Sequence, residues 1–142
     1  MEYRKLPHGE EKISVIGMGS SVVGEQKEED IIKTVEYALD AGINYFDMAG
    51  GHASIFPAYG KVMARRRKEA MLQVHFGANY MTGEYGWTTD LDTVKRSVDW
   101  QLKNLQTDYI DFGQGEFAIG AAGDHKRIFW PIGKKLQKGD IL

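Results

Sequence analysis

Strand-like apolar runs alternate with amphipathic, helix-like segments along most of this chain, and this alternation limits its possible folds more than any other feature. The apolar runs cover residues 15–17, 43–48, 71–76 and 109–112, and the amphipathic segments between them cover residues 28–41, 56–67 and 91–105. Strands that alternate with helices favour a parallel sheet joined by right-handed crossovers. We therefore expect an α/β fold in which four parallel strands alternate with three helices.

The spacing of apolar residues identifies the helical segments. One face of the third segment carries apolar side chains separated by 3, 4, 4 and 3 positions: Leu91, Val94, Val98, Leu102 and Leu105. This spacing is that of a helix with one buried face. Before the first parallel strand, residues 3–6 and 12–16 flank the turn-forming sequence Pro7-His8-Gly9-Glu10, which predicts an N-terminal β-hairpin.

Four segments, taken together and in order, resemble the aldo-keto reductase family. They are Tyr3-Arg4-Lys5-Leu6, Ile16-Gly17-Met18-Gly19, Ala41-Gly42-Ile43-Asn44-Tyr45-Phe46-Asp47-Met48-Ala49 and Leu105-Gln106-Thr107-Asp108-Tyr109-Ile110-Asp111. The resemblance covers about residues 1–113. It implies a (βα)4 half of a TIM-type barrel with the N-terminal hairpin in front of it.

The resemblance also implies a chemistry. The family transfers a hydride from NADPH to a carbonyl, and a proton donor must stand beside the oxygen that becomes negative. The family uses a tyrosine, a lysine, an aspartate and a histidine at the carboxyl ends of strands. By position, Asp47 matches the aspartate, His52 replaces the tyrosine, His75 replaces the lysine and Glu116 replaces the histidine. These four residues are the candidate catalytic groups.

The same resemblance implies NADP(H) as cofactor. The candidate cofactor contacts are the turn Gly19-Ser20-Ser21 after the first strand, together with Asp47. The family holds most of the phosphate and adenine with loops after later strands, which this sequence does not contain. Tyr59 belongs to the sequence Tyr59-Gly60-Lys61, which matches a helical segment of the family, and we expect it to be a packing residue.

After Gly113 the sequence departs from the family pattern. We expect a half-barrel over residues 1–117 and an unassigned tail over residues 118–142 that covers a sheet edge or forms an interface. The tail contains several glycines, which disfavour regular structure, and the apolar run Ile128-Phe129-Trp130-Pro131-Ile132. A truncation, a frameshift or a fusion near residue 113 would each produce such a sequence.

A half-barrel leaves its first and fourth strands as unpaired edges and exposes an interior face that we expect to be apolar. Unpaired edges associate with other strands. We therefore expect a homodimer in which two chains close an eight-stranded barrel. The alternative is a flavodoxin-like open sheet that the tail covers.

Composition excludes several functions. The net charge of −2 gives no reason to expect binding to nucleic acid or to an anionic membrane. The chain has no cysteine, which excludes disulfides and thiolate metal sites. No apolar run reaches the roughly 20 residues that a membrane-spanning helix needs, and the charged N-terminus is not that of a signal peptide. We expect a cytoplasmic protein.

Three functional interpretations follow. The first is an NADP(H)-dependent aldo-keto reductase acting on aldehydes or ketones, which is truncated and weak because most of its catalytic positions are replaced. The second is a folded fragment or engineered scaffold without catalysis. The third is a divalent-metal site formed by Asp47, His52, His75 and Glu116, since imidazoles and carboxylates are ligands for zinc, iron and manganese.

Overall fold

A parallel sheet forms the centre of the computed structural model, which describes residues 1–7, 9–115, 129–130 and 136–137. The described chain forms a five-stranded sheet in the order β10-β9-β5-β4-β3. Four of its strands are parallel: β3 (Met18–Gly19), β4 (Tyr45–Met48), β5 (Met71–Phe76) and β9 (Phe112–Gly115). The expected α/β fold with a parallel sheet is confirmed.

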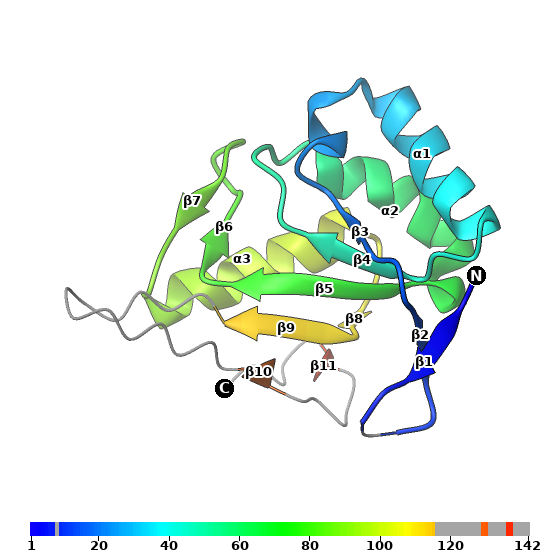
Figure 1. Ribbon diagram of the computed structural model, residues 1–142. Coiled ribbons are helices and arrows are strands. Elements are labelled where there is room, and N and C mark those ends of the chain that lie inside the picture. Colours follow the sequence, from blue (N-terminus) through cyan, green and yellow to red (C-terminus); the bar gives the residue numbers. More distant parts are fainter. Residues whose placement is uncertain (8, 116–128, 131–135, 138–142) are drawn as a thin grey trace.

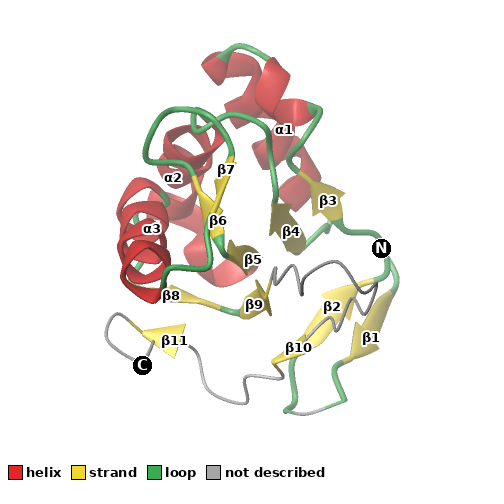
Figure 2. Ribbon diagram, turned by 90° about the vertical axis from the view of Figure 1, so that its left-hand side faces the viewer, coloured by secondary structure: helices red, strands yellow, loops and turns green. Residues whose placement is uncertain are grey.

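The three α-helices of the described chain all lie on one side of this sheet (Figures 1 and 2). They are α1 (Glu28–Asp40), α2 (Ile55–Arg66) and α3 (Leu91–Asn104), each within one residue of its expected start and end. Two 3-10 turns, η1 (Val23–Glu25) and η2 (Arg67–Glu69), precede α1 and follow α2. A flavodoxin-like sheet carries helices on both faces, so the arrangement is that of a half-barrel.

Strand alternation separates an apolar face from a polar one. Side chains of successive strand residues point to opposite faces, and the residues that face the helices are fully buried: Phe46, Met48, Leu72 and Val74. The helices meet them with their own buried residues, which include Ile31 and Val35 from α1 and Val98 and Leu102 from α3. The helical spacing in the sequence therefore identified the buried helix faces, with the exception of Leu91, which is 54% exposed at the start of α3.

The N-terminal hairpin is confirmed. The strands β1 (Tyr3–Lys5) and β2 (Lys12–Ser14) pair antiparallel. Asn44 fixes the hairpin to the loop before β4, because its side chain accepts a hydrogen bond from Ser14 N at 2.8 Å and donates one to Lys12 O at 2.8 Å. The hydroxyl of Tyr3 adds a bond to Gly42 O at 2.8 Å.

The first parallel strand lies later than the sequence predicts. Residues 15–17 were expected to form it, but pairing with β4 begins at Met18, opposite Phe46. Val15 and Ile16 are 44% and 56% exposed. The reason is local, because Val15 N still bonds to Glu2 O as an extension of the hairpin and the chain turns before it reaches the sheet.

The fourth strand is divided in two. Residues 109–112 were expected to form it, but β8 (Tyr109–Ile110) pairs with β11 (Leu136–Gln137), and only β9 joins the parallel sheet. Asp111 stands at the break, where its carboxylate accepts a hydrogen bond from Leu72 N at 2.9 Å. A side chain thus takes the place of a backbone group in the ladder with β5.

Two further pairings differ from expectation. Residues 77–87 were expected to be a loop, but they contain a short hairpin of β6 (Ala78–Asn79) and β7 (Gly86–Trp87). The fourth strand was expected to be an unpaired edge, but β10 (Phe129–Trp130) pairs antiparallel with β9. The other structural expectations for residues 118–142 fall outside the described residues.

Candidate functional site

A row of polar side chains crosses the face of the sheet that points away from the helices. Tyr45 and Asp47 come from β4, Gln73 and His75 from β5, and Gln114 from β9. The expectation of an apolar interior face is therefore wrong for this part of the chain. Strand alternation explains the result, because on β4 and β5 each of these residues follows or precedes a buried apolar neighbour that faces the helices.

Hydrogen bonds join these side chains into one network. Tyr45 Oη donates to Gln73 Oε1 at 2.8 Å. The Gln73 amide donates to Asp47 Oδ1 at 3.1 Å and to Gln114 Oε1 at 3.2 Å. His75 Nε2 lies 2.7 Å from Asp47 Oδ1. A single carboxylate oxygen of Asp47 is thus the meeting point of an amide and an imidazole.

The Asp47–His75 pair lies at the carboxyl end of the parallel strands. The side chain of His75 is 7% exposed and that of Asp47 is 31% exposed, so the imidazole is covered while the carboxylate remains accessible. Burial and, secondly, the negative charge of Asp47 raise the pKa of Tyr45 above its usual value. Tyr45 therefore keeps its proton and acts as a hydrogen-bond donor to Gln73.

His52 belongs to a different pair. It lies in the loop between β4 and α2, where its Nδ1 is 2.7 Å from Glu84 Oε2. Both side chains are exposed, at 48% and 70%. The structure thus brings two of the four catalytic candidates, Asp47 and His75, into contact and gives His52 a separate acidic partner. Glu116 lies outside the described residues.

The metal-site interpretation gains no support from the described residues. Within them, no group of three or more histidine, aspartate or glutamate side chains is arranged to hold a metal ion. The candidate ligands form two imidazole–carboxylate pairs, Asp47–His75 and His52–Glu84, instead of one cluster. The expectation that Asp47, His52 and His75 share one ligand set is therefore wrong.

The turn after β3 is tied to the end of β4. Ser20 is fully buried, and its hydroxyl accepts a hydrogen bond from Ala49 N at 2.8 Å. The Ser21 hydroxyl donates to Ala49 O at 2.9 Å, and Ser20 N donates to Asp47 O at 3.1 Å. A Cβ at Gly19 would meet nothing within 4 Å. The turn thus leaves open space at Gly19, next to the strand that carries Asp47.

These residues fit one part of NADP(H). The open turn at Gly19 admits a close ligand, and the accessible Asp47 carboxylate can accept a hydrogen bond from a ribose hydroxyl. None of the candidate contacts Gly19, Ser20, Ser21 and Asp47 carries a positive charge for the phosphates. The set therefore suits the nicotinamide and its ribose, and it does not by itself suit the phosphates.

The sequence contained a signal for part of this site. Gln73 stands two residues before His75 in β5, and Tyr45 stands two residues before Asp47 in β4, so alternation alone predicts that each pair shares a face. Glu84 gave no such signal, because it reaches His52 only through the fold of the β6–β7 hairpin.

Tyr59 is confirmed as a packing residue. It is fully buried in α2, and its ring meets that of Phe46 edge-on at 6.1 Å. Its hydroxyl has no hydrogen-bond partner among the described residues, and burial raises its pKa well above the usual value.

Replacing Tyr59 with phenylalanine removes a buried polar group that makes no hydrogen bond. We expect the free energy of unfolding to stay constant or to rise by about 1 kcal/mol, since an unpaired buried hydroxyl costs free energy. Urea unfolding of Tyr59→Phe measures this change. A loss of more than about 1 kcal/mol would show that the hydroxyl has a partner in solution.

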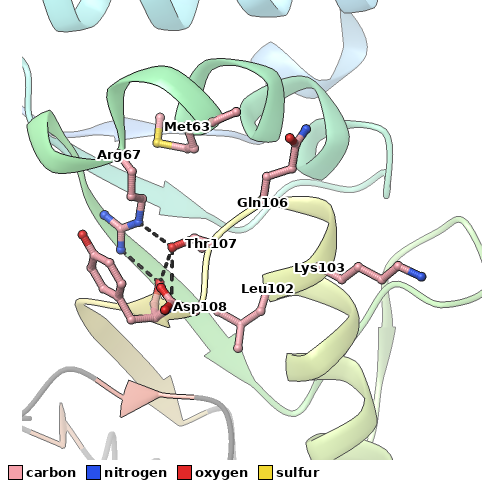
Figure 3. A pocket seen from close by; sticks show the side chains of 9 residues that line it. Met63, Arg67, Leu102, Lys103, Gln106, Thr107 and Asp108 are labelled. Carbon is pink, nitrogen blue, oxygen red and sulfur yellow. Dashed lines mark hydrogen bonds between the residues drawn. The ribbon is translucent and has the colours of Figure 1, made fainter.

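A groove lies at the opposite end of the sheet, and the polar side chains that line it stabilise the fold. It has a volume of about 580 Å³ and lies between the end of α2, the end of α3 and the residues that lead into β8 (Figure 3). Arg67 dominates one wall, and its guanidinium hydrogen-bonds to Thr107 and Asp111 and lies 3.8 Å from the centre of the Tyr109 ring. The hydrogen bonds of Arg67 thus join separate segments of the chain at the amino end of the strands.

The half-barrel and its paired Asp47 and His75 define an α/β-barrel protein with polar groups at the carboxyl end of the sheet. Residues 15–115 match the aldo/keto reductase family model. The chain therefore belongs to the aldo/keto reductase family. None of the helices in the described part of the chain is long and apolar enough to cross a bilayer.

Individual relatives agree with this assignment. The chain is 31% identical over 121 residues to an uncharacterized oxidoreductase of Bacillus subtilis, YqkF, and 32% identical over 124 residues to L-galactose dehydrogenase of Arabidopsis thaliana. These matches cover 80% and 78% of this chain but 38% and 36% of the relatives. The chain thus spans less than half the length of the curated relatives it matches.

Solved structures give the same picture. The holo form of an aldo-keto reductase from Bacillus halodurans matches with a TM-score of 0.69 and 28% identity, over 81% of this chain and 40% of that one. An aldo-keto reductase from Klebsiella pneumoniae, solved in complex with NADPH, matches with a TM-score of 0.58 and 18% identity, over 80% of this chain and 39% of that one. The second likeness shows the fold alone.

Proposed function

We propose that this chain is part of an NADP(H)-dependent aldo-keto reductase, an oxidoreductase that acts on aldehydes or ketones. The observation that supports the proposal is the 2.7 Å contact between His75 Nε2 and Asp47 Oδ1. The pair lies at the carboxyl end of the parallel strands, where barrel enzymes carry their active sites. The family resemblance implies an aspartate paired with a lysine at these positions, and here a histidine takes the place of the lysine.

In this proposal, bound NADPH supplies the hydride to the carbonyl carbon. Asp47 accepts hydrogen bonds from His75 and Gln73 and so fixes both side chains on the interior face. Its accessible carboxylate is also the group that would hold the ribose next to the nicotinamide. His52 stands at the position of the family's tyrosine and donates the proton that the carbonyl oxygen requires, because imidazole exchanges protons near neutral pH.

The rate of the isolated chain is expected to be low. Three of the four family positions carry other residues, and none of the cofactor candidates in this chain supplies a positive charge to the phosphates of NADP(H). The groups that bind those phosphates must then come from outside the described residues or from a second chain. A folded fragment without catalysis is the outcome that remains if no cofactor binds.

Association with a second copy is part of the proposal. Within the described sheet, β3 is the end strand opposite β10, and an end strand offers backbone groups to a partner strand. We propose a homodimer that uses this edge, in a cytoplasmic protein. Light scattering at micromolar concentration tests it, and a mass equal to one 16.0 kDa chain would count against it.

Replacing Asp47 with asparagine should weaken both cofactor binding and reduction. We expect NADPH to quench tryptophan fluorescence saturably in the wild-type chain, and we expect Asp47→Asn to lower the rate of 4-nitrobenzaldehyde reduction by about tenfold. The size follows from the loss of charge-assisted hydrogen bonds, since Asp47 accepts from His75 and Gln73 and would accept from the ribose. A hydrogen bond to a charged group contributes roughly 1.5–3 kcal/mol, which corresponds to about tenfold or more in rate. Absorbance at the nicotinamide band follows the reaction.

Asp92→Asn is the matched control, because it makes the same chemical change at an exposed carboxylate in the first turn of α3. Its rate and its NADPH affinity should equal those of the wild type. If NADPH does not bind to the wild-type chain at high concentration, the proposed function is wrong. Equal rates for Asp47→Asn and Asp92→Asn would remove Asp47 from the site.

A further inference from the structure

The tip of the β6–β7 hairpin rests on the loop that follows β4. An isolated antiparallel bridge joins His52 to Glu84, and the backbone adds Ala53 N to Gly83 O at 2.9 Å and Tyr85 N to Gly51 O at 2.9 Å. The two segments are far apart in the sequence, and Figure 1 shows β6 and β7 rising beside the loop after β4. Backbone bonds thus hold the hairpin in place without help from the Glu84 side chain.

Aromatic packing anchors the hairpin underneath. Tyr80 is fully buried, and its ring lies 4.7 Å from that of Phe56 and 5.7 Å from that of Tyr85. Phe56 belongs to the first turn of α2, which begins just after the His52 loop. The hairpin and the loop therefore form one unit in which the positions of His52 and Glu84 are fixed relative to each other.

The side chains of Glu84 and His52 meet through one oxygen and one ring nitrogen. Glu84 Oε2 lies 2.7 Å from Nδ1 of His52, and an ionised carboxylate can only accept a hydrogen bond. The Nδ1–H of His52 must then be the donor. Because one ring nitrogen is committed to the carboxylate, Nε2 is the nitrogen that can give up or take a proton.

We propose that Glu84 is a positioning residue for proton transfer, and that it holds the His52 ring with Nδ1–H on the carboxylate and Nε2 available to the substrate oxygen. This inference rests on the proposed reductase function. Neither the family resemblance nor the sequence pattern assigns a role to Glu84. The ligand that Nε2 would meet is the oxygen of an aldehyde or a ketone.

The proposed reaction adds one hydride and one proton to the carbonyl group. NADPH, when bound, would supply a hydride to the carbonyl carbon and become NADP⁺, and the π electrons of the C=O bond would move onto oxygen. That oxygen takes the proton from Nε2 of the doubly protonated His52 ring, and the product is an alcohol. His52 is left as the neutral Nδ1–H tautomer, which Glu84 stabilises, and Nε2 regains a proton from water.

The first arm of the test measures which nitrogen of the His52 ring carries the proton. Nitrogen-15 NMR of the full chain distinguishes the two neutral tautomers, and a His52→Gln variant assigns the signal among the four histidines. We expect Nδ1–H in the wild type and in Glu84→Gln, whose amide oxygen still accepts the bond. In Glu84→Ala we expect a shift toward Nε2–H. An unchanged tautomer in Glu84→Ala would overturn the proposal.

The second arm of the test measures kcat and KM of the Glu84 variants. We expect Glu84→Gln to lower kcat for 4-nitrobenzaldehyde roughly fivefold with KM unchanged, because a charged acceptor makes the hydrogen bond about twice as strong as a neutral one. Glu84→Ala should lower kcat further, while Asp92→Asn should leave it unchanged. Equal kcat in wild type and both Glu84 variants would contradict a positioning role.

The two arms separate this inference from the proposed function. Circular dichroism checks that the Glu84 variants keep the fold, which the backbone bonds of the hairpin favour. If the wild-type chain binds no NADPH and reduces no aldehyde, the proposed function fails. The role of Glu84 in proton transfer then fails with it, and the NMR arm alone reports whether Glu84 orients the His52 ring.

Discussion

Replacing Arg67 with alanine should lower the free energy of unfolding by about 3 kcal/mol, the lower end of the cost of removing one partner from a buried ion pair, because this pair is mostly but not fully buried. The Arg67 side chain is 11% exposed and that of its partner Asp111 is 16% exposed, with Nη2 and Oδ2 separated by 2.8 Å. In the variant, the partly buried carboxylate of Asp111 would lose its counter-charge. That uncompensated charge is the main source of the expected loss.

The guanidinium also satisfies backbone groups. It donates to Ala70 O at 2.7 Å and to Tyr109 O at 3.0 Å, and its Nε donates to the Thr107 hydroxyl at 2.9 Å. Arg67 therefore joins the start of β5 to the segment that leads into β8. Lysine at position 67 cannot replace it, because a single ammonium does not match the planar fork of donors that these acceptors require.

Arg65 provides the matched control. It lies two residues earlier, in the last turn of α2, but its side chain is 63% exposed and pairs with Glu36 at 2.6 Å across the surface. Arg65→Ala should stay within about 1 kcal/mol of the wild type, as exposed ion pairs do. Urea unfolding followed by circular dichroism measures both variants. Equal losses for Arg65→Ala and Arg67→Ala would contradict the buried role of Arg67.

The helices were predictable because their signal is local. The apolar stripe that includes Val94, Val98 and Leu102 and the cap at Asp90 both lie within one short stretch of sequence. In the structure Thr93 donates to Asp90 through its backbone and its hydroxyl, and these bonds lower the pKa of Asp90 below its usual value. A cap and a stripe need no distant residue, so the sequence alone places α3 correctly.

The fourth strand was not predictable in the same way. Residues 109–112 read as one apolar run, but the charges of Arg67 and Asp111 come together at its middle and interrupt the ladder with β5. The two residues are 44 positions apart. A pairing at that separation depends on the fold of everything between them, and no local pattern in the sequence reports it.

The candidate site also has a part that local sequence predicts and a part that it does not. Asp47 and His75 come from adjacent strands whose register sets Asp47 opposite Gln73, so alternation and strand order together predict that the two side chains meet. His52 and Glu84 lie in loops, whose positions follow from hairpin docking and aromatic packing. The strand half of the site was thus accessible from sequence, and the loop half required the structure.

Replacing Gly60 with alanine should destabilise the fold by about 2 kcal/mol, although alanine is the better helix former. An ideal Cβ at this position would overlap the backbone carbonyl oxygen of Asn104 at the end of α3. Overpacking costs about 1–3 kcal/mol and occasionally more, and a backbone group cannot rotate aside as a side chain can. The gain in helix propensity, about 1 kcal/mol, offsets only part of this cost.

The position of that carbonyl is fixed, which is why the clash cannot relax easily. Asn104 is the last residue of α3, and Leu105 N still donates to Gln101 O at 2.8 Å. The chain then turns through Gln106, which has a φ of 53°.

Gly51→Ala is the matched control, because a Cβ at Gly51 meets nothing within 4 Å. Its stability should stay within about 0.5 kcal/mol of the wild type. If Gly60→Ala were as stable as Gly51→Ala in urea unfolding, then α2 and the end of α3 would not approach closely in solution, and the close helix contact that fixes the half-barrel's outer layer would have to be abandoned.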